Sequence, residues 1–173
     1  MSFDLSKAIT VIERTPAVLI SLLDGLDAYW TESGHKVDDW QPFDVVGHLI
    51  HAEKTDWIPR ARIILARDGD RQFVPFDRLA QFELSNGKEL GSLLEEFKQL
   101  RAESLSTLSS WRLAADDLEL TGLHPELGEV TLGQLLATWV VHDLTHIRQI
   151  CVKMAGRYTE AVGPWREYLS ILK

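Results

Sequence analysis

The stretch from Thr131 to Met154 constrains the fold of this chain more than any other. Its apolar residues recur every three or four positions, which is the period of an amphipathic helix. Thr131 can cap the N-terminus of this helix, and Gln134 follows at the spacing of a capping box. The face predicted to turn inward begins apolar and becomes polar halfway along: Leu132, Leu135, Trp139, His142, His146 and Gln149.

The two histidines of this face need a common explanation. Burying an imidazole without a hydrogen-bond partner costs about 1–3 kcal/mol, so two on one inward face are expensive. His142 and His146 are four residues apart, and side chains at this spacing lie about 6 Å apart on one side of a helix. They could therefore bind one metal ion. The alternative is a pair that is hydrogen-bonded inside the protein or lies at its rim, and the spacing alone leaves both open.

Length and composition are those of a single globular domain over residues 1–173. Hydrophobic residues make up 45% of the chain, and no apolar run approaches the roughly 20 residues of a membrane span. The opening MSFDLSKAIT lacks the pattern of a signal peptide, and the single cysteine, Cys151, suits a reducing compartment. We therefore expect a cytoplasmic protein with no membrane partner, and a Cys151 that serves as a small buried hydrophobe.

The net charge of −8 argues against a nucleic-acid partner, because binding to phosphates requires clustered Lys and Arg. No basic run is present in the sequence. DNA and RNA are therefore not expected as ligands.

Helical periodicity dominates the chain, which predicts an all-α fold: an up-down four-helix bundle with a short N-terminal helix and a C-terminal closing helix. Pro16 and Pro42 fit the first position of a helix, and Pro59 should kink the helix that contains it. The predicted helices cover 4–13, 16–30, 42–69, 85–111 and 131–154, and a short closing helix follows Gly156. Loops are expected between them, with one helical turn around 76–83 and a possible extended piece near 118–123.

The second long helix carries two more histidines, His48 and His51, about 60° apart around its axis. Either could turn inward, and periodicity does not choose between them. His35 is expected in a solvated loop. His124 precedes a proline and is expected to have a structural or rim role.

Two blocks of sequence together resemble a known family. They are WQPFDVVGHLIHAE at 40–53 and HPELGEVTLGQLLATWVVHDLTHIRQ at 124–149. With ERTPAVL near the N-terminus and the closing GPWREYL, the chain resembles the DinB-like (DinB/YfiT-like) metalloenzymes, which are four-helix-bundle proteins. The resemblance covers essentially the whole chain. Each motif is weak by itself, and their order and spacing make the combination specific.

The resemblance implies a metal site made by three histidines. Carried over residue by residue, the ligands are His48, rather than His51, together with His142 and His146. Three neutral imidazoles with an open position are typical of a catalytic site, and zinc is favoured over nickel as the divalent ion.

Four neighbouring residues have weaker assignments. Gln149 is expected to make an inward hydrogen bond near the metal, and His51 either reaches the pocket or lies partly exposed at the surface. Glu53 and Asp143 lie on helix faces away from the ligands. They are expected to be solvated charges or partners that fix an imidazole tautomer.

The resemblance also implies a class of function. It favours a metal-dependent thiol transferase of the bacillithiol or mycothiol type, or a hydrolase, acting on a small-molecule substrate with a low-molecular-weight thiol as a possible cofactor. The alternative is a non-catalytic metal-binding or stress-related helical scaffold, and a homodimer is expected in either case. The sequence assigns no catalytic residue beyond the ligands.

A protease is not expected, although His142-Asp143-Leu144-Thr145-His146 resembles HExxH. In metalloproteases the glutamate is the general base, and Asp is one methylene shorter. No third ligand of the zincin type follows downstream.

Overall fold

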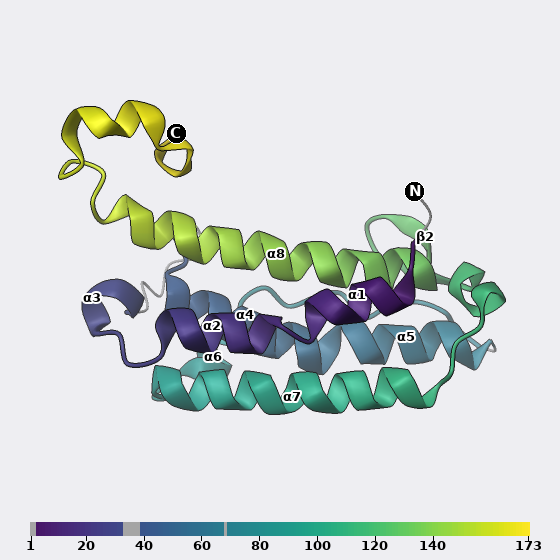
Figure 1. Ribbon diagram of the computed structural model, residues 1–173. Coiled ribbons are helices and arrows are strands. Elements are labelled where there is room, and N and C mark those ends of the chain that lie inside the picture. Colours follow the sequence, from purple (N-terminus) through teal and green to yellow (C-terminus); the bar gives the residue numbers. More distant parts are fainter. Residues whose placement is uncertain (1–2, 33–38, 68) are drawn as a thin grey trace.

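The computed structural model describes residues 3–32, 39–67 and 69–173. Four helical segments pack side by side as a bundle: α1–α2 (Leu5–Ile12 and Thr15–Leu23), α4–α5 (Pro42–Thr55 and Trp57–Ala66), α7 (Leu90–Ser110) and α8 (Leu132–Gly156). In Figure 1, α8 runs along the top, α7 along the bottom, and α1–α2 lies in front of α4–α5. The predicted all-α four-helix bundle is confirmed.

The directions of the helices depart from simple alternation. The connection after α5 crosses back along the bundle and contains the short helix α6 (Ala80–Ser85), so that α7 runs parallel to α4–α5 (Figure 1). Helix α8 runs parallel to α1–α2 (Figure 1). Such crossover connections are a known variant of the four-helix bundle. Here the crossover brings the segment before α7 alongside α4.

The predicted helix over 16–30 ends early. Helix α2 begins at Thr15 and stops at Leu23, and a separate short helix α3 covers Ala28–Thr31. Gly25 adopts the left-handed conformation with φ 74°, which interrupts the helix at little steric cost because glycine has no Cβ.

The predicted kink near Pro59 is a break between α4 and α5. Asp56, between the two helices, stays in the right-handed helical region but is distorted, with φ −102° and ψ −70°. Because Pro59 has no N–H group for the carbonyl of Thr55, the helical ladder is interrupted at this point. Helix α4 itself starts as predicted at Pro42, and its N-terminus is closed by a hydrogen bond of 2.9 Å from Gln41 N to Asp44 Oδ2.

The connection before α8 contains a β-hairpin, of which the sequence indicated only an extended piece. Strands β1 (Thr121–His124) and β2 (Gly128–Thr131) pair antiparallel, after a 3₁₀ turn η1 (Ala115–Glu119). The last residue of β2, Thr131, is also the N-cap of α8: its hydroxyl accepts from Gln134 N at 3.1 Å, as the capping box predicted. The hairpin therefore fixes where α8 begins.

The C-terminal segment differs from the predicted closing helix. It forms two 3₁₀ turns, η2 (Gly163–Tyr168) and η3 (Ser170–Leu172), at the end of α8 (Figure 1). Trp165 and Tyr168 are exposed. Turns of the 3₁₀ type have poorer hydrogen-bond geometry than an α-helix and stay short.

The apolar core has two clusters, one toward each end of the bundle. The first gathers around Trp57 and Trp139, and the second around Leu49 and Phe97. Buried polar side chains lie between them, and they include His48 and His146, whereas His142 is partly exposed. None of the helices in the described part of the chain combines the length and apolar character needed to cross a bilayer.

Candidate metal centre

Three histidines converge between α4 and α8. His48 Nε2 lies 3.1 Å from His142 Nε2, which in turn lies 3.1 Å from His146 Nε2. One nitrogen from each ring lies within 4.8 Å of the others, close enough to share one metal ion. The structure thus brings together the three residues that the resemblance selected. It also places His48, not His51, on the side of α4 that faces α8.

Two glutamines hold the rings from behind. Gln81 Oε1 lies 3.0 Å from His48 Nδ1, and Gln149 Oε1 lies 2.8 Å from His146 Nδ1. An amide oxygen can only accept, so both Nδ1 atoms carry the proton and both Nε2 atoms keep a free lone pair toward the cluster. Hydrogen bonds of this kind orient metal-binding histidines in proteins. Gln149 lies where the sequence predicted it, and Gln81 was not predicted.

Burial keeps all three rings neutral at pH 7. Desolvation, followed by repulsion from His146, lowers the pKa of His48 to about 3. Desolvation, followed by repulsion from His146 and His48, lowers the pKa of His142 to about 2. Burial also lowers the pKa of His146, against the opposing effect of Gln149. Neutral imidazoles are the form that binds metal, so the donor set fits a divalent ion.

These shifts predict how the metal-free protein responds to acid. The pKa values of these histidines in the folded protein lie below the unfolded value near 6.5. Below that pH the histidines of the unfolded chain therefore bind protons, whereas those of the folded chain stay neutral. The free energy of unfolding is expected to fall as the pH drops from 6.5 to 4, by up to about 1.4 kcal/mol per pH unit for each histidine. Urea denaturation of chelator-treated protein at each pH measures this. His48→Gln should remove one such contribution, and an unchanged slope in that variant would contradict the assignment.

Aromatic side chains enclose the cluster. The ring centroid of Trp40 lies 4.9 Å from that of His48, and Phe76, from the segment before α6, lies 5.3 Å from His48. Trp57 meets His142 edge-on at 5.1 Å. These contacts restrict the motion of the imidazoles and exclude water from their sides.

The remaining histidines lie outside this cluster. His51 is buried under Phe76, with ring centroids 4.7 Å apart, so the expectation of a partly exposed surface histidine is wrong. Neither ring nitrogen of His51 has a hydrogen-bond partner among the described residues. His124 accepts from the backbone N–H groups of Glu126 and Leu127 at 3.1 and 3.2 Å, a structural role in the hairpin turn. His35 lies outside the described residues.

Glu53 and Asp143 also differ from expectation. Both are buried, and both form ion pairs with Arg101 of α7, so they are neither solvated charges nor partners of an imidazole. The helix faces away from the ligands point at α7 rather than at water. Cys151, by contrast, is only half-buried.

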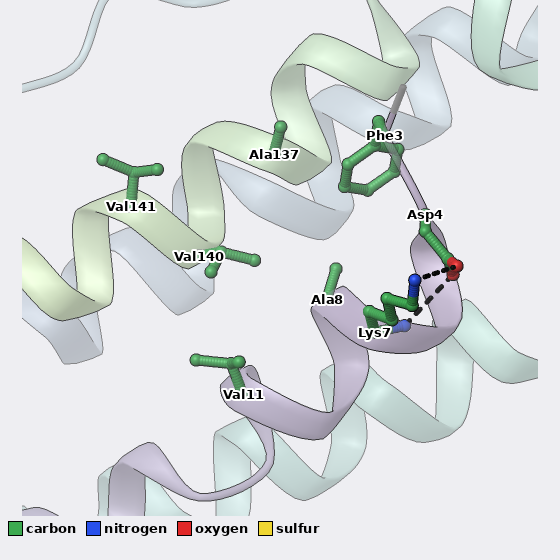
Figure 2. Close-up of a pocket in the computed structure, with 8 residues that line it drawn as sticks. All are labelled: Phe3, Asp4, Lys7, Ala8, Val11, Ala137, Val140 and Val141. Carbon is green, nitrogen blue, oxygen red and sulfur yellow. Dashed lines mark hydrogen bonds and ion pairs between the residues drawn. The ribbon is translucent and has the colours of Figure 1, made fainter. Parts of the chain in front are cut away.

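The cluster meets the surface at His142. This residue borders a groove of about 500 Å³ on α8, together with Gln134, Ala137, Thr138, Val141 and Thr145. A neighbouring groove of about 540 Å³ is lined by residues of both α1 and α8 and shares Ala137 and Val141 with the first. Figure 2 shows its walls, with Ala8 and Val11 of α1 across from the α8 residues. The larger groove contains none of the three histidines, so His142 is the one member of the cluster that lines either of these two grooves.

A four-helix bundle in which side chains of facing helices converge is an architecture that builds metal sites in its core. The family model of the DinB superfamily matches residues 12–150, so the chain belongs to the DinB superfamily. A comparison with curated protein sequences finds no match.

Solved structures support the fold. YfiT from Bacillus subtilis, described as a probable metal-dependent hydrolase with an unusual four-helix bundle topology, superposes with a TM-score of 0.71 at 22% identity over 87% of this chain and 86% of YfiT. TT2238, described as a four-helix bundle protein, superposes with a TM-score of 0.53 at 19% identity over 86% of this chain and 98% of TT2238.

Proposed function

We propose that this protein binds one divalent metal ion through His48, His142 and His146 and uses it as an enzyme that activates a small nucleophile. The observation that carries the proposal is the convergence of three neutral imidazole nitrogens. We favour zinc as the ion and nickel as the next; imidazole nitrogen binds both, so the ligand type does not rank them. The description of YfiT as a probable metal-dependent hydrolase supports the same class of activity.

The chain itself supplies the geometry. Gln81 and Gln149 hold the protons of His48 and His146 at Nδ1, so that the opposite nitrogens stay available. Trp40 and Phe76 shield the rings from water, which strengthens polar interactions inside the site. When bound, a divalent ion lowers the pKa of a water or thiol at its open position and so supplies a nucleophile near neutral pH.

The nucleophile distinguishes two reactions. With water the protein is a hydrolase, and with a low-molecular-weight thiol such as bacillithiol or mycothiol it is a transferase. The alternative of a non-catalytic metal scaffold is less well supported, because His142 reaches the surface at a groove of the size of a small-molecule site. The walls of this groove are largely apolar, which suits an organic substrate.

Cobalt substitution tests the proposal. The chelated protein is expected to take up about one cobalt ion per chain, and His146→Ala is expected to lose most of this binding. Bacillithiol, mycothiol and glutathione are then added in turn. A thiolate ligand adds a sulfur-to-cobalt charge-transfer band, and its appearance would identify the transferase.

The possible results distinguish the transferase, the hydrolase and the absence of a metal site. A normal cobalt spectrum that no thiol changes would reject the transferase and leave the hydrolase. A wild-type protein that binds no cobalt would reject the metal site itself. The thiol band should strengthen as the pH rises, because thiol binding releases a proton.

A further inference from the structure

A buried polar layer crosses the middle of the bundle. It consists of Thr15, Glu53, Arg101 and Asp143, one residue from each of the four helical segments. Arg101, which is 1% exposed, is its centre and binds Asp143 through two nitrogens, at 2.6 and 3.1 Å. It also donates to Glu53 Oε1 from Nε at 2.9 Å and to the carbonyl of Ile12 at 2.7 Å. The Thr15 hydroxyl completes the layer by donating to Asp143 at 2.6 Å.

The polar layer lies at the same level as the three histidines. On α8, Asp143 falls between the ligands His142 and His146, and on α4, Glu53 follows His48 by little more than one turn. Arg101 therefore ties together the two helices that carry the ligands. The two apolar clusters of the core meet this layer from opposite ends of the bundle.

Aromatic rings also connect Arg101 to the three-histidine cluster. The guanidinium of Arg101 lies over the ring of Trp139 at 5.1 Å, and Trp139 stacks on Trp57 at 5.5 Å. Trp57 in turn contacts His142. Arg101 is thus connected to this ligand both along α8, through Asp143, and across the core.

Stability alone does not account for such a layer. Burying charges costs several kcal/mol per ion, and apolar replacement of a whole buried ion cluster is often neutral or stabilising by about 1–4 kcal/mol. Buried ionic groups are better attested as devices that specify register. The paired nitrogens of an arginine suit this role, because a two-pronged contact with a carboxylate fixes orientation as well as distance.

A metal site made by two helices needs that register. The tip of a side chain lies about 6 Å from its helix axis, so a rotation of only 10° displaces it by about 1 Å. Distances between metal and ligand are defined to within about 0.2 Å. Leucine-rich packing alone tolerates larger shifts than this.

We propose that Arg101, held by Glu53 and Asp143, is a positioning residue of the metal centre: it sets the register of α4 against α8 at which the three imidazoles can share one ion. This inference rests on the proposed metal site. It assigns to the polar layer the tuning of metal affinity rather than the stabilisation of the bundle.

The test separates positioning from folding. A variant carrying Glu53→Leu, Arg101→Met and Asp143→Leu is expected to keep its circular dichroism spectrum and its resistance to urea. Its zinc affinity, measured by competition with a chromophoric chelator, is expected to fall about 10–100-fold, a loss of the size seen when groups that orient metal ligands are removed. Its cobalt spectrum should also change, because the ligands are no longer held at one geometry.

Two further variants keep the test decisive. Asp143→Asn preserves size and shape and removes the charge-assisted pairing, so it should also lower zinc affinity. This single variant tests the positioning role even if the triple variant does not fold. Arg60→Met is the matched control: Arg60 is also buried and pairs with Asp56 at 2.9 Å, but both residues belong to successive turns of one helical segment. Its zinc affinity should stay within about twofold of wild type, although its stability falls.

The outcomes distinguish the two proposals. A wild-type protein that binds no zinc would overturn the proposed function, and this inference with it. A wild-type protein that binds zinc, with Asp143→Asn and a folded triple variant that bind it equally well, would overturn the positioning role of Arg101 alone.

Discussion

Replacing His48 with alanine is expected to lower the zinc affinity of the protein by on the order of 10²–10³-fold. Structural zinc sites with four ligands bind with about 10–16 kcal/mol, so one ligand accounts for roughly 3–4 kcal/mol, and every 1.4 kcal/mol is a factor of ten. His48 is the proposed ligand from α4, and its Nε2 lies 3.1 Å from Nε2 of His142. Chelator competition measures the affinity, and elemental analysis of the purified protein measures the metal content.

His51→Ala is the matched control for this experiment. His51 and His48 are equally buried, at 6% and 7% exposure, and both lie on α4 against Phe76. Truncating His51 therefore disturbs the same helix without removing a member of the cluster, and zinc affinity should change little. If His51→Ala strips the metal and His48→Ala retains it, α4 is rotated by about 60° from the arrangement described.

The second large effect is expected from Trp139→Ala. Trp139 is 0% exposed and stacks on Trp57 at 5.5 Å with planes 10° apart. Removing a buried tryptophan leaves a cavity that the surrounding helices fill only in part, which typically costs about 3–5 kcal/mol. Urea denaturation of the chelated protein should show this loss, so that metal binding does not contribute to the measured difference.

Trp165→Ala makes the comparison specific to burial. Trp165 is the same residue type, lies in η2 and is 71% exposed, so its truncation should change the free energy of unfolding by less than about 0.5 kcal/mol. Equal losses in the two variants would mean that the C-terminal turns pack against a surface and that Trp139 is not the anchor of its cluster.

Much of the ligand helix could be predicted from the sequence. Periodicity and the Thr131 capping box located α8, and the change from apolar to polar along its inner face pointed to His142 and His146. His48 could not be chosen by periodicity, because His51 lies only about 60° away on the same helix. That choice came from the resemblance, and the geometry places His48 in the cluster.

The parts of the site that the sequence did not reveal have a common physical cause. Gln81 lies in α6, which packs against α4 only because of the crossover between α5 and α7. Arg101 is a long cation inside an apolar helical stripe, where a charged residue is usually placed in solvent. Its two buried partners, Glu53 and Asp143, were misplaced for the same reason. Pairing across three helices is a tertiary event that no local pattern encodes.

Local signals also explain the errors in the fold. A four-residue strand is too short for an alternating pattern to stand out, so the sequence predicted only one extended piece where the structure has the β1–β2 hairpin. Gly25 could have signalled the end of α2, but the leucines on either side keep the helical spacing across it. The expected homodimer stays a prediction.

The wide spacing of the ligands along the chain determines when the site can form. His48 and His142 are 94 residues apart. Contacts of such separation form late, because the entropy cost of closing a long loop comes before the contact can stabilise the chain. At about 5–20 residues per second, a ribosome needs roughly 5–20 s to add the intervening residues. During that interval His48 has no partner from α8. The proposed three-histidine site is therefore complete only after α8 has been synthesised and has packed against α4.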